Sequence, residues 1–226
     1  MTEELKAAGE IAKATKSGID ASREFGGFIS RFISGPLEQG IGIFEDKLKY
    51  MRWERQVAIM DKVNRKMAER GLDGPTQTVP LKITIPLLQA ASMEDEDDLQ
   101  ELWANLLVNA ADKESEIEPR HAYISLLKDL TNFDAQILEK LYSNSIDLGE
   151  QIYTWQLPDE ISMEKPNDLN PFTYPTGEVL LSLEALCRLG LLEPIGLAGV
   201  RIGPGVRCVF KTTLGLNFYK ACTIKK

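Results

Sequence analysis

One amphipathic stretch constrains the fold of this chain more than any other feature of the sequence. Between residues 95 and 111, apolar side chains recur with the 3.6-residue period of an α-helix, which predicts a helix with one buried face. Trp103 lies near the middle of that face, where a large aromatic ring typically fills a protein core. The predicted face consists of Leu99, Leu102, Trp103, Leu106, Leu107 and Ala110. The stretch therefore predicts an all-helical domain that has these side chains as its core hub.

The acidic run at residues 94–98 indicates where this helix begins. Negative charge is favoured at a helix N-terminus, and Ser92 with Asp95 three positions later has the spacing of a capping box. A short preceding helix is expected to open at Pro86. The carboxylates could also attract Mg²⁺ or Ca²⁺, but consecutive helix positions point in different directions and the glycine turn of an EF-hand is missing. We therefore expect no metal here.

Further helices are expected on both sides of the hub. A long helix is predicted over residues 37–70, with Gly71 directly behind it as a C-terminal stop. Its bases interleave with acids, which is typical of a solvated face. Thr131 or Asn132 is expected to cap a later helix. Together these stretches predict a helical domain over residues 1–132.

The remainder of the chain predicts a second domain over residues 133–226. Residues 144–175 contain four prolines without a clear period, and we expect them to form an irregular insertion. After them the sequence predicts a helix, a β-hairpin with a Gly-Pro-Gly turn at residues 203–205, and a final helix. This order resembles the end of a winged-helix unit. The predicted fold class is therefore mainly α, a multi-helix bundle followed by a winged-helix-like unit with a small β-hairpin.

Charge is distributed unevenly along the chain. The formal net charge is −8; residues 71–133 carry 4 basic and 12 acidic side chains, and six bases without an acid follow Glu193. In a winged helix the hairpin can lie along a DNA backbone, where basic side chains contact phosphates. The candidate contacts are Arg201, Arg207 and Lys211. The helix that would read the bases carries Glu178 and Glu184 with a single Arg188, so protein contact is favoured over DNA contact.

The sequence contains no pattern typical of a catalytic or cofactor site. His121 is the only histidine, no nucleophile motif such as Gly-x-Ser-x-Gly accompanies it, and no glycine-rich phosphate loop is present. The three cysteines form no Cys-x-x-Cys pair, which argues against zinc and fits reduced thiols in a cytoplasm. We expect a protein without enzyme activity, metal or cofactor, in which His121 has a structural role.

Hydropathy argues against a secreted or membrane-spanning protein. The first residues lack the apolar segment of a signal peptide, and no run reaches the roughly 20 apolar residues of a membrane span. The apolar, glycine-rich segment 25–44 has features of membrane-active peptides, but Arg31, Pro36 and Glu38 interrupt it. We expect this segment to pack in a core and the protein to be cytoplasmic.

The stretch from Phe28 to Asp134 contains two motifs that match a known family pattern, the second of which ends at Ala135. The first is Leu-Trp-Ala-Asn-Leu-Leu-Val-Asn-Ala at residues 102–110. The second runs from His121 to Ala135, where His-x-x-Ile precedes a Leu-Thr-x-x-Asp-Ala turn. The stretch thereby resembles a bacterial family, the abortive infection alpha proteins. This resemblance implies a link to phage defence by abortive infection, and it implies no activity and no catalytic residue.

Three functions follow as hypotheses. The first is a non-enzymatic phage-defence protein that acts through a protein partner, which can be phage-derived, and through self-association. The second is a DNA-binding transcriptional regulator that uses the winged helix. The third is a membrane-active effector that uses residues 25–44. We favour the first because the sequence offers no catalytic set and the candidate base-reading helix is acidic.

Overall fold

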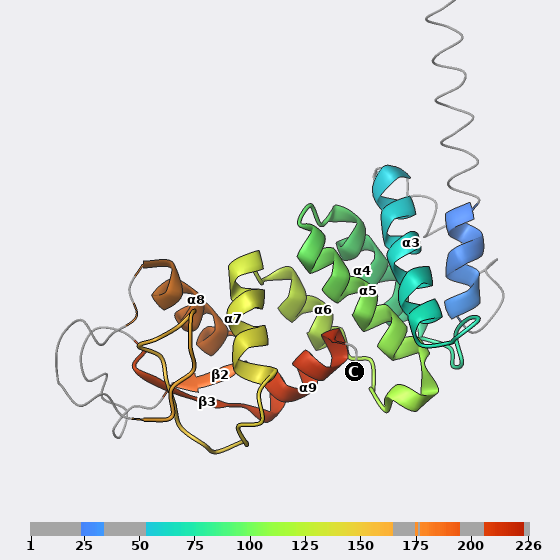
Figure 1. Cartoon of the computed structure of the whole chain (residues 1–226). Helices are drawn as coiled ribbons and strands as arrows, with labels where there is room; N and C mark the ends of the chain where they lie inside the picture. The colour runs from blue at the N-terminus through green and yellow to red at the C-terminus, as the bar shows by residue number, and fades with distance from the viewer. Residues whose placement is uncertain (1–23, 34–52, 165–174, 176, 195–205, 224–226) are drawn as a thin grey trace, which may run out of the picture. The chain divides into compact units, whose positions relative to one another are not determined.

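The computed structural model describes residues 24–33, 53–164, 175, 177–194 and 206–223 (Figure 1). The chain divides into two compact units, Met1–Ile124 and Ser125–Lys226, which we describe separately. The first unit is helical, and the second combines helices with a three-stranded antiparallel sheet. These elements confirm the predicted fold class, mainly α with a small sheet near the C-terminus.

The first unit is built around the Trp103 helix. Its described elements are a helix over residues 24–32, α3 (Trp53–Glu69), α4 (Leu81–Met93), α5 (Asp97–Ala111), the short 3-10 helix η2 (Lys113–Ser115) and the start of α6 (His121–Lys128). Helix α5 packs against both α3 and α4. Every residue from Trp103 to Asp112 is buried. The helix is therefore enclosed on all sides rather than along one stripe, which is typical of the central helix of a core.

The start of α5 differs from the predicted capping arrangement. Ser92 lies inside α4, where its hydroxyl donates to the carbonyl of Gln89 at 2.9 Å. The expected capping box at Ser92 and Asp95 is therefore wrong, because the hydroxyl is used within the preceding helix. The carboxylate of Glu94 instead accepts from the backbone amides of Asp95 and Glu96 at 2.9 and 3.1 Å.

Helix α4 begins earlier than predicted. It starts at Leu81, directly after Pro80, and contains Pro86 in its interior. Pro86 was expected to open the helix. A proline at this position removes only the one backbone hydrogen bond that its missing N–H would have made, and the burial of Leu87 and Leu88 behind it stabilises the continued helix.

The described part of the apolar segment 25–44 lies in the core of the first unit. Phe25, Phe28, Ile29 and Phe32 are all buried, and the amide of Val79 donates to the carbonyl of Phe32 at 2.7 Å. Residues 34–52, which include the beginning of the predicted helix 37–70, lie outside the described residues. Among the described residues, no helix has the length and apolar character that crossing a membrane requires.

The second unit places a small sheet among three helices. Its elements after the end of α6 are α7 (Asn132–Tyr142), β1 (Ile152–Tyr153), α8 (Gly177–Arg188), β2 (Leu192–Pro194), β3 (Cys208–Lys211) and α9 (Thr213–Cys222). Thr131 caps α7, and its side chain forms a capping box with Asp134. The strands lie in the order β1-β3-β2, with Leu192 opposite Lys211 and Ile152 opposite Val209. Strand β1 falls within the segment 144–175 that was expected to be irregular.

Candidate functional site

Basic side chains of α3 meet acidic side chains at the start of α5. Lys62 Nζ lies 2.6 Å from Asp97 Oδ1 and 2.9 Å from Glu101 Oε1. Lys66 Nζ lies 2.6 Å from Glu101 Oε2, and Arg65 also contacts Glu101. We call the set Arg55, Lys62, Arg65, Lys66, Asp95, Asp97 and Glu101 the charge seam, since Arg55 likewise pairs with Asp95.

Glu101 is the electrostatic centre of the charge seam. Burial raises the pKa of its carboxyl, but hydrogen bonds from Lys66, Lys62 and Arg65 outweigh burial and lower the pKa to about 2. Burial lowers the pKa of Lys62, and its bonds to Asp97 and Glu101 raise it above the usual value. These bases are therefore engaged with acids of the same unit, and the side chains of Lys62 and Lys66 are only 10% exposed. The predicted solvated face is here a packed, ion-paired contact between α3 and α5.

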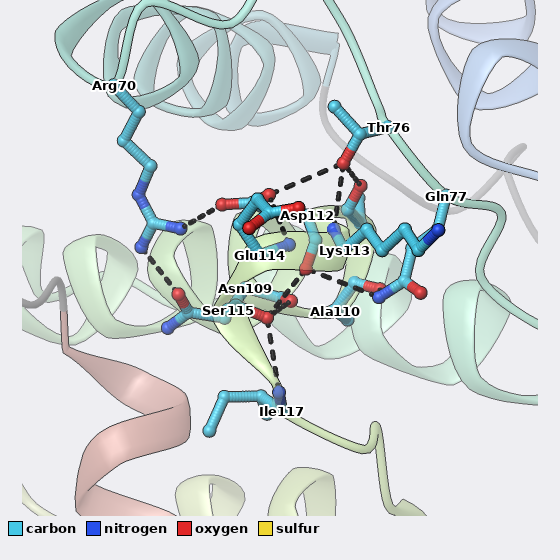
Figure 2. Close-up of polar contacts among 11 residues, drawn as sticks. Arg70, Thr76, Gln77, Asn109, Ala110, Asp112, Lys113, Glu114, Ser115 and Ile117 are labelled. Atoms are coloured by element: carbon cyan, nitrogen blue, oxygen red, sulfur yellow. Dashed lines mark hydrogen bonds and ion pairs between the residues drawn. The ribbon is translucent and has the colours of Figure 1, made fainter.

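A second polar set closes the other end of α5 (Figure 2). Arg70 donates to Asp112 Oδ2 at 3.1 Å and to Asn109 Oδ1 at 2.5 Å. The other oxygen of Asp112 accepts from Thr76 Oγ1 at 3.3 Å and from the amide of Glu114 at 3.0 Å. We call these residues, with Gln77 and Ser115, the Asp112 cluster.

The Asp112 cluster satisfies carbonyl groups that a helix C-terminus leaves without intrahelical partners. The amides of Thr76 and Gln77 donate to the carbonyl of Ala111 at 2.9 and 3.0 Å, and Gln77 Nε2 donates to that of Ala110 at 3.1 Å. Ser115 Oγ lies 2.5 Å from the carbonyl oxygen of Asn109. The polar groups of the Asp112 cluster thus fix the segment after α3 to the end of α5. The cluster is a structural cap.

The second unit contains a polar network around Tyr142 at the end of α7. The Tyr142 hydroxyl donates to the carbonyl of Leu191 at 2.5 Å and accepts from the amide of Thr212 at 3.0 Å. Thr212 Oγ1 donates to the carbonyl of Gly190 at 2.7 Å and accepts from the amide of Gly215, which caps α9. Burial raises the pKa of Tyr142, which keeps the hydroxyl protonated as a donor. The network ties α7 to one end of the β2–β3 pair, where Leu191 precedes β2 and Thr212 follows β3.

The candidate nucleic-acid contacts lie in different environments. Arg201 lies outside the described residues, and Arg207 is half-buried with its carbonyl accepting from the amide of Thr154 at 3.0 Å. Lys211 is 6% exposed, and its ammonium donates to Asn144 Oδ1 and the carbonyl of Ile146, both at 2.8 Å. Burial lowers the pKa of Lys211. Its ammonium therefore has an internal role in the second unit.

The remaining residues singled out in the sequence are placed as follows. His121 is exposed at the first residue of α6. Leu99, Trp103, Leu106 and Leu107 of the core hub are buried, and Leu102 is half-buried. Within the part of the chain that the structure describes, no group of three or more His, Cys, Asp or Glu side chains is arranged to hold a metal ion.

Helix α8, whose Glu178, Glu184 and Arg188 were weighed in the sequence as base-reading residues, also exposes a leucine that the sequence did not single out. Leu181 is 67% exposed there. The other exposed residues of this helix are Gly177, Glu178, Glu184 and Arg188, at the spacing that places them on one face. Ser182, Leu183 and Leu186 occupy the opposite, buried face. We call the exposed set the α8 outer face. Adjacent Leu180 and Leu181 gave no sequence signal for which one would be exposed.

Comparison with known proteins gives one match. The family model described as abortive infection alpha matches residues 54–222. This range includes α5 and continues through the second unit, beyond the stretch whose motifs carried the resemblance in the sequence. No curated protein and no solved structure matches the chain significantly.

Proposed function

The chain belongs to the abortive infection alpha family, which implies a role in abortive-infection defence, and we propose that it acts there without catalysis, through contacts with other proteins and with copies of itself. The α8 outer face carries this proposal. A leucine with 67% of its surface exposed is unusual on a helix whose other apolar residues are buried or half-buried. The α8 outer face thus presents an apolar side chain with charged side chains around it, and protein contacts likewise have an apolar centre and a polar rim.

The topology of the second unit supports the same interpretation. The strand order β1-β3-β2, with α8 directly before β2, agrees with the predicted winged-helix-like unit, in which α8 would have the place of the recognition helix. The outer face of this helix offers Glu178, Leu181, Glu184 and Arg188. Two carboxylates against one guanidinium disfavour a phosphate backbone, whereas a central leucine with charged flanks suits a protein surface.

The two charged sets of the first unit support a scaffold role. In both the charge seam and the Asp112 cluster, acids and bases are paired with each other and hold α3 against α5. The paired polar residues in this part of the chain therefore have a structural role that needs no substrate. We therefore assign recognition to exposed surfaces such as the α8 outer face.

DNA binding remains the second candidate because the tail after Glu193 has six bases and no acid. A fair test of it avoids Lys211, whose substitution would disturb the bonds to Asn144 and Ile146. Reversal of charge at Arg201 and Arg207 should lower DNA affinity and its salt dependence if these residues contact phosphates. Unchanged DNA binding, or none, would eliminate this candidate.

The proposed function is tested by purification of the tagged protein from phage-infected and uninfected cells, with nuclease treatment throughout. We expect protein partners that survive nuclease, together with protection of the culture. Leu181→Asp should abolish partner recovery and protection, while Leu148→Asp, at a 44% exposed leucine outside α8, should preserve both. Full activity of Leu181→Asp, or turnover of nucleotide or nucleic acid that a point substitution removes, would contradict the proposal.

A further inference from the structure

We infer that the α8 outer face binds the α8 outer face of a second copy of this chain, with the two helices antiparallel. The inference rests on the proposed function and names one partner for the same surface. It assigns the ion pairs of the interface to Glu178 of one copy and Arg188 of the other. Leu181 provides the apolar contact between them.

The spacing of the exposed residues gives the register. Gly177, Leu181, Glu184 and Arg188 follow one another at intervals of four, three and four, which is the spacing of a helix–helix seam. A two-fold axis between residues 182 and 183 sets Gly177 opposite Arg188 of the second copy and Leu181 opposite Glu184 of the second copy. The same residues then meet twice, as a self-complementary contact requires.

Charge complementarity selects the antiparallel arrangement and the second copy. Glu178 and Arg188 lie ten positions apart on a helix that rises about 1.5 Å per residue, so they occupy opposite ends of the face. Antiparallel pairing brings each arginine beside Glu178 of the other copy, whereas parallel pairing would set Glu178 against Glu178. Among the described residues, neither Glu178 nor Arg188 has an ion-pair partner in its own chain. Each end of the face is thus left with a charge that the other end complements.

The centre of the face can accommodate this contact. A Cβ placed on Gly177 would meet no described atom within 4 Å, so the glycine leaves open space for the long arginine side chain opposite it. Leu181, 67% exposed, would be covered by the aliphatic part of Glu184. One leucine per copy and a 12-residue helix give a small interface, so we expect a weak dimer that forms as protein concentration rises.

The pairing is tested by sedimentation velocity of the full chain over a concentration series. We expect the wild type to dimerise, and Arg188→Glu and Glu178→Arg each to remain monomeric, since each sets like charges opposite one another. An equimolar mixture of these two variants should recover the dimer, because every Glu–Arg pair is restored across the interface. Glu150→Arg, at an exposed loop position in the same unit, should leave dimerisation unchanged.

The proposed pairing is overturned if the wild type stays monomeric at all concentrations, or if the mixture of the two variants fails to recover the dimer. It is also overturned if Arg188→Glu dimerises as the wild type does. These outcomes are distinct from failure of the proposed function. A monomeric wild type whose partner recovery and protection still depend on Leu181 would preserve the proposed function and assign the surface to another protein. Circular dichroism of each variant verifies that its fold is intact.

Discussion

Gly215 lies against the hydroxyl of Tyr142 so closely that a Cβ atom on this glycine would stand 2.1 Å from the hydroxyl oxygen. The same Cβ would stand 2.3 Å from the carbonyl oxygen of Leu191, a backbone atom. Because real Cβ contacts do not approach so near, only glycine permits the hydrogen bonds from Tyr142 and Thr212 to form beside the start of α9. The packing of α7 on α9 therefore depends on the absence of a side chain at residue 215.

Gly215→Ala should therefore destabilise the second unit, although alanine in a helix normally stabilises a protein by up to about 1 kcal/mol relative to glycine. We expect a loss of about 3 kcal/mol from overpacking and from displacement of the Tyr142 hydroxyl. Urea denaturation measures this loss. Gly74→Ala, whose Cβ would meet no atom within 4 Å, is the control and should change stability little. Equal effects of the two substitutions would contradict this close approach.

Trp103→Ala should destabilise the first unit by about 3–5 kcal/mol, because it removes a 1% exposed indole from the enclosed part of α5 and leaves a cavity. Chemical denaturation followed by far-UV circular dichroism would measure the change. Met93→Ala, at a 74% exposed position just before the same helix, serves as the matched control and should stay within about 0.5 kcal/mol. If Trp103→Ala lowered the free energy of unfolding by less than about 1 kcal/mol, the Trp103 ring would not belong to the core.

Glu101→Gln should lower the free energy of unfolding by about 1–2 kcal/mol at pH 7, with allowance for solvent screening by the exposed part of the seam. The pKa of Glu101 is lowered in the folded protein, to about 2 from an ordinary 4.5. Its contribution is therefore complete above pH 4.5 and disappears as the pH falls towards 2. Urea titrations at pH 7, 4 and 2.5 should show the difference between wild type and variant shrinking.

The control for this pH experiment is Glu118→Gln. Glu118 pairs with Arg120 at 3.0 Å, but both side chains are more than half exposed, at 78% and 60%. Such a pair contributes little to stability, so its removal should have almost no effect at any of these pH values. A difference for Glu101→Gln that grew as the pH fell would show that its carboxyl is not held ionised by the bases of α3.

The thiols should react slowly in the folded protein. Burial, with a contribution from nearby Glu184, raises the pKa of Cys187 to about 11, and burial raises that of Cys208 to about 11 and that of Cys222 still further. At pH 7.5 a pKa of about 11 leaves a thiolate fraction roughly 100-fold below that of an ordinary cysteine. Mass spectrometry after iodoacetamide treatment should show Cys187, which is half-buried, labelled first, and all three labelled rapidly in urea. Rapid labelling of Cys222 in buffer would refute its burial.

Local patterns in the sequence predicted the helices better than the contacts between them. The 3.6-residue period around Trp103 depends only on neighbouring residues, as does the capping box of Thr131 with Asp134. The pairing of Lys62 with Asp97 and Glu101 depends instead on α3 and α5 lying side by side, and no spacing in the sequence selects those acids. Local signals are therefore most reliable where the structure itself is local.

The elements that the sequence did not predict have a similar cause. Strand β1 has only two residues, too few for an alternating pattern, and its partner Val209 lies far along the chain. Ser92 has a capping spacing but uses its hydroxyl within α4. The exposure of Leu181 is decided by which side of α8 meets the rest of the second unit. Because Leu180 and Leu181 are adjacent and identical, the sequence does not indicate which of the two is exposed. The pairing of β1 and the exposure of Leu181 are selected by tertiary packing, whereas Ser92 forms a local bond within its own helix.

The bonds of the Tyr142 hydroxyl also bear on the order in which the protein matures during synthesis. They join residues 49 and 70 positions apart, whereas the ion pairs that hold α3 to α5 are complete once Asp112 has been added. Since the ribosome releases a chain from its N-terminus, the first unit can close while the second is still being translated. A chain truncated before Thr212 would accordingly keep a closed first unit, but its second unit would lack the amide that donates to the Tyr142 hydroxyl.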